Sequence, residues 1–68
     1  MIYEYAYLYG DIDEDKFVFE TENETKEIKA FPFERLTVLG NLGRQGWKVI
    51  ECRGRLTYFL ERAITEND

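Results

Sequence analysis

The sequence predicts a two-layer α+β domain, in which one helix lies across one face of a mainly antiparallel sheet of four or five strands. Three observations lead to this fold class. Aromatic and β-branched residues alternate with the two-residue period of strands in several short segments, one segment carries leucines at helical spacing, and turn-forming residues separate these segments. The 68 residues suffice for one domain, which we place at 1–62, followed by a polar tail at 63–68.

The first strand is predicted at residues 2–9, where tyrosines occupy every second position and therefore share one face. These are Tyr3, Tyr5, Tyr7 and Tyr9. Aromatic side chains on one strand face usually serve packing, so we expect the tyrosine face to lie beneath the helix. A stacking platform for nucleotide bases is the alternative. The second face of the sheet would then carry Ile2, Ala6 and Leu8, joined by Val18.

A second strand is predicted at 16–21, after an acidic turn. Phe17 and Phe19 share one of its faces. Residues 25–31 fit either a short edge strand paired with this one or an irregular arm. We favour the strand, because the charged residues that flank Ile28 suit an exposed edge.

The helix is predicted at 32–45. Pro32 is favourable in the first turn of a helix, and Gly46 is well placed to adopt the left-handed conformation that ends one. The apolar residues between them recur at helical spacing and predict the face that packs on the sheet: Phe33, Leu36, Leu39 and Leu42, with Val38 alongside. Strands at 47–52 and 56–62 follow and should pair antiparallel.

Residues 39–50 read LxxLGxxGWxVI, where x is any residue, and residues 3–5 read YEY. These motifs resemble those of a family of small bacterial and phage domains of unknown function. The last strand of that family is similar to residues 59–62, although Glu61 stands where the family often has lysine. The resemblance covers most of the chain apart from about 11–31. It implies the fold described above and no settled function.

The longer motif also has a physical interpretation as a helix-to-strand corner. Its structural residues are Leu39, Leu42, Gly43, Gly46 and Trp47. We expect the two leucines to face the sheet, Gly43 to allow close approach of the backbone, Gly46 to stop the helix and Trp47 to close the end of the core. Such a corner requires no active site.

The composition argues against several functions. The chain has no histidine and a single cysteine, Cys52, so it lacks the commonest general base and the ligands of a usual four-coordinate zinc site. We expect Cys52 to be a buried, inert thiol, and we expect neither enzymatic activity nor a cofactor. The net charge of −5 argues against general nucleic-acid binding. No apolar run approaches the roughly 20 residues that cross a membrane, and cysteine usage suits a reducing, cytoplasmic location.

Charge is distributed unevenly along the chain. Residues 1–34 hold 3 basic and 10 acidic side chains, whereas residues 35–68 hold 6 basic and 4 acidic ones. Two candidate sites follow: an acidic loop for a basic partner, Asp11, Asp13, Glu14 and Asp15, and a basic patch for an anion or ligand, Arg44, Lys48, Arg53 and Arg55. For both sets, a solvated surface is the simpler interpretation.

The acidic loop also matches part of a calcium-binding pattern. Asp11, Asp13, Asp15 and Glu22 fall at positions 1, 3, 5 and 12 of such a loop. Lys16 stands at position 6, where the sharp turn needs glycine, and the flanking segments are predicted strands rather than helices. We therefore expect no metal site.

Two classes of function stay open. The first is a non-catalytic interaction protein, such as a phage or mobile-element accessory factor, that binds a host protein through residues 11–27 or an aromatic surface. The second is a homo-oligomer that binds a small ligand or nucleotide with the basic residues of 44–55. We expect a homodimer or small homo-oligomer in either class, because an apolar second sheet face on so small a domain favours self-association.

Overall fold

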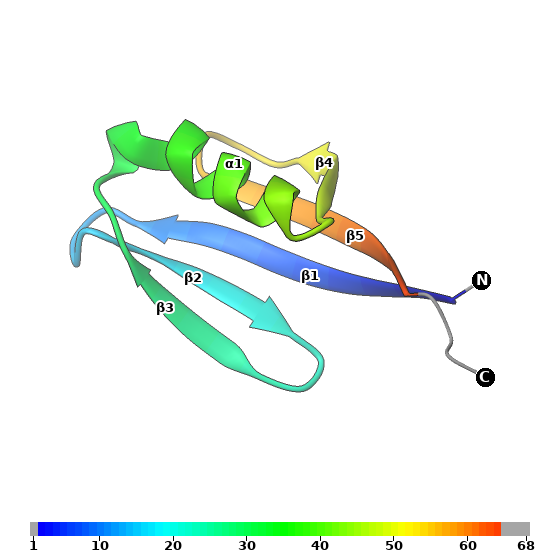
Figure 1. Cartoon of the computed structure of the whole chain (residues 1–68). Helices are drawn as coiled ribbons and strands as arrows, with labels where there is room; N and C mark the ends of the chain where they lie inside the picture. Colours follow the sequence, from blue (N-terminus) through cyan, green and yellow to red (C-terminus); the bar gives the residue numbers. More distant parts are fainter. Residues whose placement is uncertain (1, 65–68) are drawn as a thin grey trace.

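The computed structural model describes residues 2–64 (Figure 1). Within this range, five strands form one sheet: β1 (Ile2–Asp11), β2 (Lys16–Thr21), β3 (Thr25–Lys29), β4 (Lys48–Cys52) and β5 (Thr57–Ile64). A 3₁₀ turn, η1 (Pro32–Glu34), and one helix, α1 (Arg35–Arg44), lie between β3 and β4. The predicted fold class is confirmed.

The strand order is β3-β2-β1-β5-β4, and each neighbouring pair is antiparallel. The predicted edge strand therefore forms, and it ends at Lys29 rather than at residue 31. β1 lies at the centre of the sheet, where it pairs with β2 on one side and with β5 on the other. No helix over residues 2–64 has the length and apolar character needed to cross a membrane.

The helix covers the face of the sheet opposite to the one that we expected. Ala6 and Leu8 from β1 lie beneath it, and the tyrosines of β1 face away from it. The remaining members of the buried cluster are Phe17, Phe19, Val38, Leu42, Trp47, Tyr58 and Leu60. A two-residue period shows which side chains share a face, but it does not show which face is covered. Tyrosine hydroxyls beneath a helix would also lose their hydrogen bonds to water.

The helix buries fewer residues than its sequence pattern predicts. Val38 and Leu42 are buried and Leu39 is half-buried, whereas Phe33 and Leu36 are 77% and 75% exposed. The expected packing of Phe33 and Leu36 on the sheet is therefore wrong. Each helical residue rotates by about 100°, so Leu36 lies about 140° from the centre of a stripe formed by Val38 and Leu42. Phe33 belongs to the 3₁₀ turn, which has a different period.

The C-terminal end of α1 is closed by backbone hydrogen bonds. The Trp47 amide donates to the Leu42 carbonyl at 3.1 Å, and the Gly46 amide donates to the Gly43 carbonyl at 3.0 Å. This is the Schellman arrangement, which requires a left-handed residue at the helix end. Gly46 supplies it with φ of +96°, as predicted. Because Trp47 and Leu42 are both buried, the hydrophobic contact typical of this motif fixes the start of β4.

The last strand is longer than predicted. β5 includes Ala63 and Ile64, which pair with Tyr3 and Ile2 of β1. These two residues were expected in the polar tail. The remainder of that tail, 65–68, lies outside the described residues.

The tightest backbone approach involves Gly10, near the end of β1. A Cβ atom at this position would lie 2.9 Å from Leu56 Cδ1 and 3.2 Å from Phe17 Cε2. The Gly10 amide also donates to the Leu56 carbonyl at 2.9 Å, so the strand cannot shift away without losing this hydrogen bond. By contrast, a Cβ at Gly40 in α1 would meet no atom within 4 Å.

We predict that Gly10→Ala lowers the free energy of unfolding by about 1–3 kcal/mol, because the added methyl group overpacks the contact with Leu56 and Phe17. Gly40→Ala is the matched control. It should stabilise the protein by about 0.5–1 kcal/mol, since alanine favours a helix over glycine. Urea unfolding of both variants at one protein concentration checks the prediction. An equal effect of the two substitutions would contradict it.

Candidate functional site

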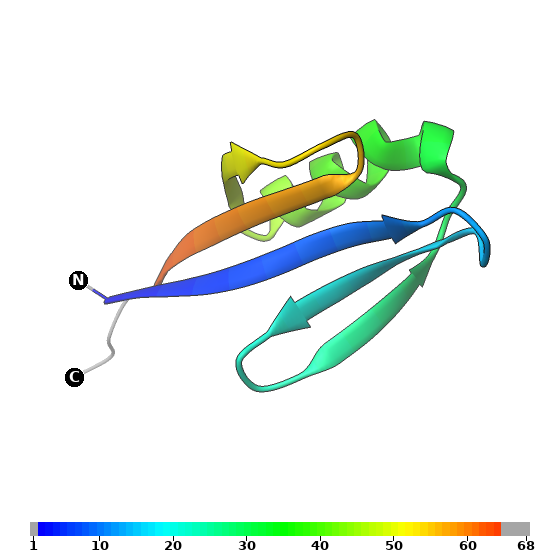
Figure 2. The same ribbon diagram turned by 180° about the vertical axis from the view of Figure 1, so that it is seen from behind.

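The tyrosine side of the sheet is uncovered by any element of residues 2–64. Figures 1 and 2 show α1 on one side of the sheet only. We call the opposite side the open face, and its central row the tyrosine stripe: Tyr3, Tyr5, Tyr7 and Tyr9, with Phe59 from β5. Because β1 is the central strand, the tyrosine stripe runs along the middle of the open face.

The tyrosine stripe is packed at one end and exposed at the other. The Tyr7 ring lies 4.9 Å from the Phe59 ring and 5.2 Å from the Tyr9 ring, measured between centroids. Tyr5 and Tyr3 are 59% and 47% exposed. The difference arises because β2 pairs with β1 only from Ala6 onward, so residues 2–5 have a strand neighbour on one side alone.

A shallow hollow lies at this step in the sheet. Its volume is about 270 Å³, and its walls include the rings of Tyr5, Tyr7 and Phe59 and the side chains of Glu20 and Glu22. Three aromatic walls give the hollow an apolar base, and two carboxylates lie on one side of it. The hollow therefore presents aromatic rings and carboxylates together on the open face.

Ion pairs border the open face on both sides. On the β3 side, Lys16 Nζ lies 2.8 Å from Glu27 Oε2. Val18, which pairs with Glu27 and lies on the open face rather than with Ala6 and Leu8 as expected, is only 8% exposed. The hydrogen bond from Lys16 to Glu27 is the main cause that raises the pKa of Lys16 above its ordinary value of 10.5. A lysine whose pKa is raised in the folded protein stabilises the fold. This stabilisation is fully present below pH 10.5 and is lost as the pH rises through the raised pKa. Lys16 therefore stays charged at neutral pH.

On the β4 side, Arg53 Nε donates to Glu51 Oε2 at 2.7 Å. The Arg53 guanidinium also lies over the Phe59 ring, 5.6 Å from its centroid. The hydrogen bond to Glu51 is the main cause that raises the pKa of Arg53. Arg53 thus covers Phe59, at the side of the tyrosine stripe, and its ion pair with Glu51 reduces the positive charge that it offers to a ligand.

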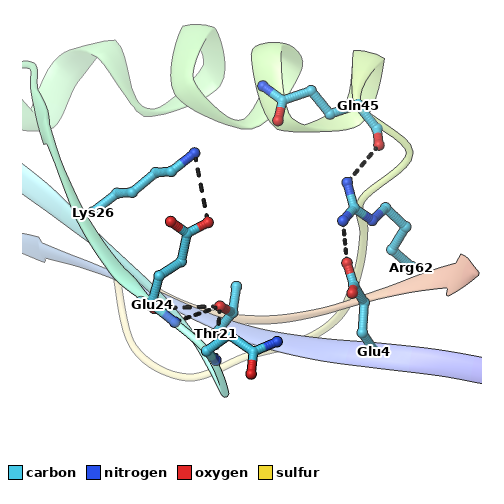
Figure 3. A network of polar contacts seen from close by, with 7 residues as sticks. Glu4, Thr21, Glu24, Lys26, Gln45 and Arg62 are labelled. Atoms are coloured by element: carbon cyan, nitrogen blue, oxygen red, sulfur yellow. Dashed lines mark hydrogen bonds and ion pairs between the residues drawn. The ribbon is translucent and has the colours of Figure 1, made fainter.

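A second polar cluster joins the helix-to-strand corner to the sheet (Figure 3). Arg62 of β5 donates to the Gln45 carbonyl at 3.3 Å and forms an ion pair with Glu4 of β1. Its guanidinium also lies 4.5 Å from the centroid of the Trp47 ring. Arg62 therefore holds the C-terminal end of α1, the start of β4 and the start of β1 together. No sequence motif singled out this role.

A cavity of about 220 Å³ separates Arg62 from the β2–β3 turn. On its far side, the Thr21 hydroxyl accepts hydrogen bonds from the Asn23 and Glu24 amides at 3.3 and 3.2 Å. Lys26 Nζ lies 3.8 Å from Glu24 Oε2 (Figure 3). Cations and carboxylates alternate around this cavity and largely pair with one another. The arrangement braces the turn and offers no concentrated charge of one sign.

The acidic loop forms the turn between β1 and β2. Asp11 Oδ1 accepts hydrogen bonds from the Asp13 and Glu14 amides at 3.1 and 3.2 Å. Asp15 adopts a positive φ of 51°, which closes the turn. Over residues 2–64, no three histidine, cysteine or acidic side chains are placed to hold a metal ion.

The basic patch is spread along β4. Arg44 ends α1, Lys48 begins β4, and Arg53 and Arg55 follow the other end of that strand. Five strand residues span about 16 Å, so the fold places Arg44 and the Arg53–Arg55 loop at opposite ends of β4. Arg44 donates to Asn41, and Arg53 pairs with Glu51.

The corner residues do not all behave as expected. Leu42 and Trp47 are buried, and Leu39 packs against the core as a half-buried residue. A Cβ at Gly43 would meet no atom within 4 Å, so the close approach expected there is not found. Cys52 is exposed, with its thiol donating to the Gly54 carbonyl at 3.3 Å. The expectation of a buried thiol is wrong because β4 is an edge strand.

Comparison with known proteins identifies no relative of this chain. A scan against protein-family models finds none that matches, and searches of curated proteins and of solved structures find no significant match. The resemblance to the phage and bacterial family therefore stays a prediction.

We predict that Arg62→Met lowers the free energy of unfolding by about 1–3 kcal/mol, because it removes a charge-assisted hydrogen bond and leaves Glu4 without its partner. Lys48→Met is the matched control: Lys48 is exposed, and the same substitution there should change stability by less than about 0.5 kcal/mol. A double-mutant cycle with Glu4→Gln should show a coupling of the two side chains. Additive effects would contradict the role assigned to Arg62.

Proposed function

We propose that this protein is a non-catalytic interaction module that self-associates through the open face of its sheet. The observation that supports the proposal is the tyrosine stripe, which places partly exposed aromatic rings on the one broad surface that α1 leaves uncovered. Aromatic residues are enriched at protein interfaces, where their large rings contribute contact area at low entropic cost. A two-fold axis through β1 would set each stripe against its copy.

The size of the open face is compatible with a dimer of moderate affinity. With strands about 4.8 Å apart and a rise of about 3.3 Å per residue, five strands of this length give a face of roughly 500 Å². Two such faces bury about 1,000 Å², before surface corrugation adds to it, which is the lower end of the range for specific interfaces. We therefore expect a dissociation constant in the micromolar range.

Stacking of nucleotide bases on the same rings is less well supported. Binding of a single strand needs a positively charged groove that follows the phosphates. Along the open face, Lys16, Lys48 and Arg53 alternate with Glu20, Glu27, Glu51 and Glu61. The balance of charge favours a protein surface over a nucleic acid as the partner. Binding of a small ligand or nucleotide at 44–55, a host-protein partner and a cytoplasmic location stay predictions.

Sedimentation analysis over a wide concentration range tests the proposal. The protein should shift from monomer to dimer in the micromolar range. The double variant Tyr3→Ser/Tyr5→Ser should raise the dissociation constant by about tenfold or more, because it removes the two most exposed rings of the stripe. The circular dichroism spectrum of the variant should be unchanged, since neither ring belongs to the buried cluster.

Leu36→Ser is the control, because Leu36 is an exposed apolar residue of α1, on the other side of the sheet. It should leave the dimer intact. A wild-type protein that stays monomeric at the highest concentration would overturn the proposal. So would a single-stranded oligonucleotide that binds at physiological salt and is released by the tyrosine substitutions.

A further inference from the structure

The β1–β2 turn, η1 and the β4–β5 connection lie at one end of the molecule (Figures 1 and 2). Residues of these three segments line a second uncovered apolar surface. We call it the end patch, and its members are Ile12, Phe31 and Phe33, which are 63%, 47% and 77% exposed. Ile12 and Phe33 line one hollow, and the Phe31 ring stacks on Phe33. Single exposed apolar residues are common on proteins, whereas a group of large ones marks a contact site. None of these three side chains belongs to the core or to the open face.

The end patch includes a groove. Its volume is about 640 Å³, and its apolar walls are formed by Ile12, Phe33, Pro32 and Leu56. This volume lies in the range of sites that take a few side chains of a ligand. Three separate segments of the chain build the walls, so the groove exists only in the folded protein.

Local contacts within the chain hold the aromatic wall in place. The Phe31 and Phe33 rings are stacked at 5.3 Å with an angle of 5° between their planes. Glu34 fixes the backbone beneath them, because its carboxylate accepts from the Phe31 amide at 3.0 Å and its own amide donates to the Phe31 carbonyl at 2.9 Å. Pro32 between the two phenylalanines restricts the backbone further. Little conformational entropy is lost when a ligand contacts such a surface.

The polar lining of the groove is cationic. Arg35 and Arg55 contribute its only charged side chains among the described residues. The other three arginines of the chain, Arg44, Arg53 and Arg62, each have a hydrogen-bond partner on a side chain, whereas within residues 2–64 neither groove arginine has one. Two free guanidinium groups beside an apolar groove are complementary to a carboxylate.

The neighbouring hollow has the opposite charge. It is lined by Glu14, Asp15 and Glu34, with Lys29 and Phe31, and its volume is about 350 Å³. A carboxylate on the ligand is repelled from this side and attracted to the arginine side. The two hollows therefore fix the direction in which a charged ligand lies across the Phe31–Phe33 pair.

We propose that the end patch binds a short segment of a partner protein in which an aromatic or large aliphatic side chain stands beside aspartate or glutamate. The apolar side chain fills the groove against Phe33, and the carboxylate pairs with Arg35 and Arg55. The complementarity of charge selects this chemistry over a basic or purely apolar segment. This surface is separate from the open face, so one protein can self-associate and hold such a segment at the same time.

Selection from a random dodecapeptide library displayed on ribosomes tests the proposal with an unbiased probe. The immobilised wild-type protein should enrich sequences that carry an acidic residue next to a large apolar one. A synthetic fluorescent copy of the most enriched peptide then measures affinity by anisotropy. Phe33→Ser should weaken binding by about tenfold or more, and Arg35→Gln and Arg55→Gln by about three- to tenfold each, with a weaker dependence on salt.

Tyr5→Ser is the matched control and should bind the peptide as the wild type does, which separates this site from the open face. The exposed Phe33 can be replaced without loss of the fold, and an unchanged unfolding midpoint verifies this. Enrichment of basic peptides, or no enrichment that depends on Phe33, would overturn the proposal. A loss of self-association in Phe33→Ser would also overturn it, because the end patch would then contact a second copy.

Discussion

One constraint organises this protein: a single ten-residue helix has to cover a five-stranded sheet. The helix can bury one face only, and it covers the face with small and aliphatic residues at its centre, Ala6 and Leu8. Apolar side chains on that face lose their contact with water, which is the main source of stability in so small a domain. No second layer covers the other face within residues 2–64, and Tyr3 and Tyr5 are exposed there.

The position of the helix depends on the corner that follows it. Backbone hydrogen bonds close the helix at Gly46, and Trp47 enters the core directly afterwards. Arg62, which belongs to β5, adds a polar link from this corner to the central strand β1. With its C-terminal end held in this way, the helix directs Val38 and Leu42 inward. Leu36, near its first turn, is consequently directed outward.

The two uncovered surfaces follow from this arrangement and differ in character. The open face is broad, nearly balanced in charge and centred on the tyrosine stripe, which suits a symmetric contact between copies. The end patch is narrow, grooved and bordered by arginines, which suits a small segment of another protein. In the proposals made above, both surfaces bind through contact with another protein, and neither proposal involves a metal or a general base.

The sequence by itself determined the elements and placed most of their boundaries within two residues. The alternation of aromatic residues, the leucine spacing before Gly46 and the turn residues are local signals, and they predicted the strand at 16–21 without error at either end. The conformation of Gly46 was predicted for the same reason. These features depend on backbone geometry within a few residues, so the residue types and their spacing predict them.

Only the tertiary structure decided which sides are buried. The tyrosine period gave two faces without saying which one the helix covers, and the helical spacing included Phe33 and Leu36 although neither reaches the sheet. Strand order and the role of Arg62 could likewise not be predicted from the sequence, because both depend on contacts between residues far apart in the chain. The structure therefore favours the open face and the end patch over the acidic loop and the basic patch as candidate sites. Burial depends on how the helix packs on the sheet, and the residue pattern of a single segment does not determine it.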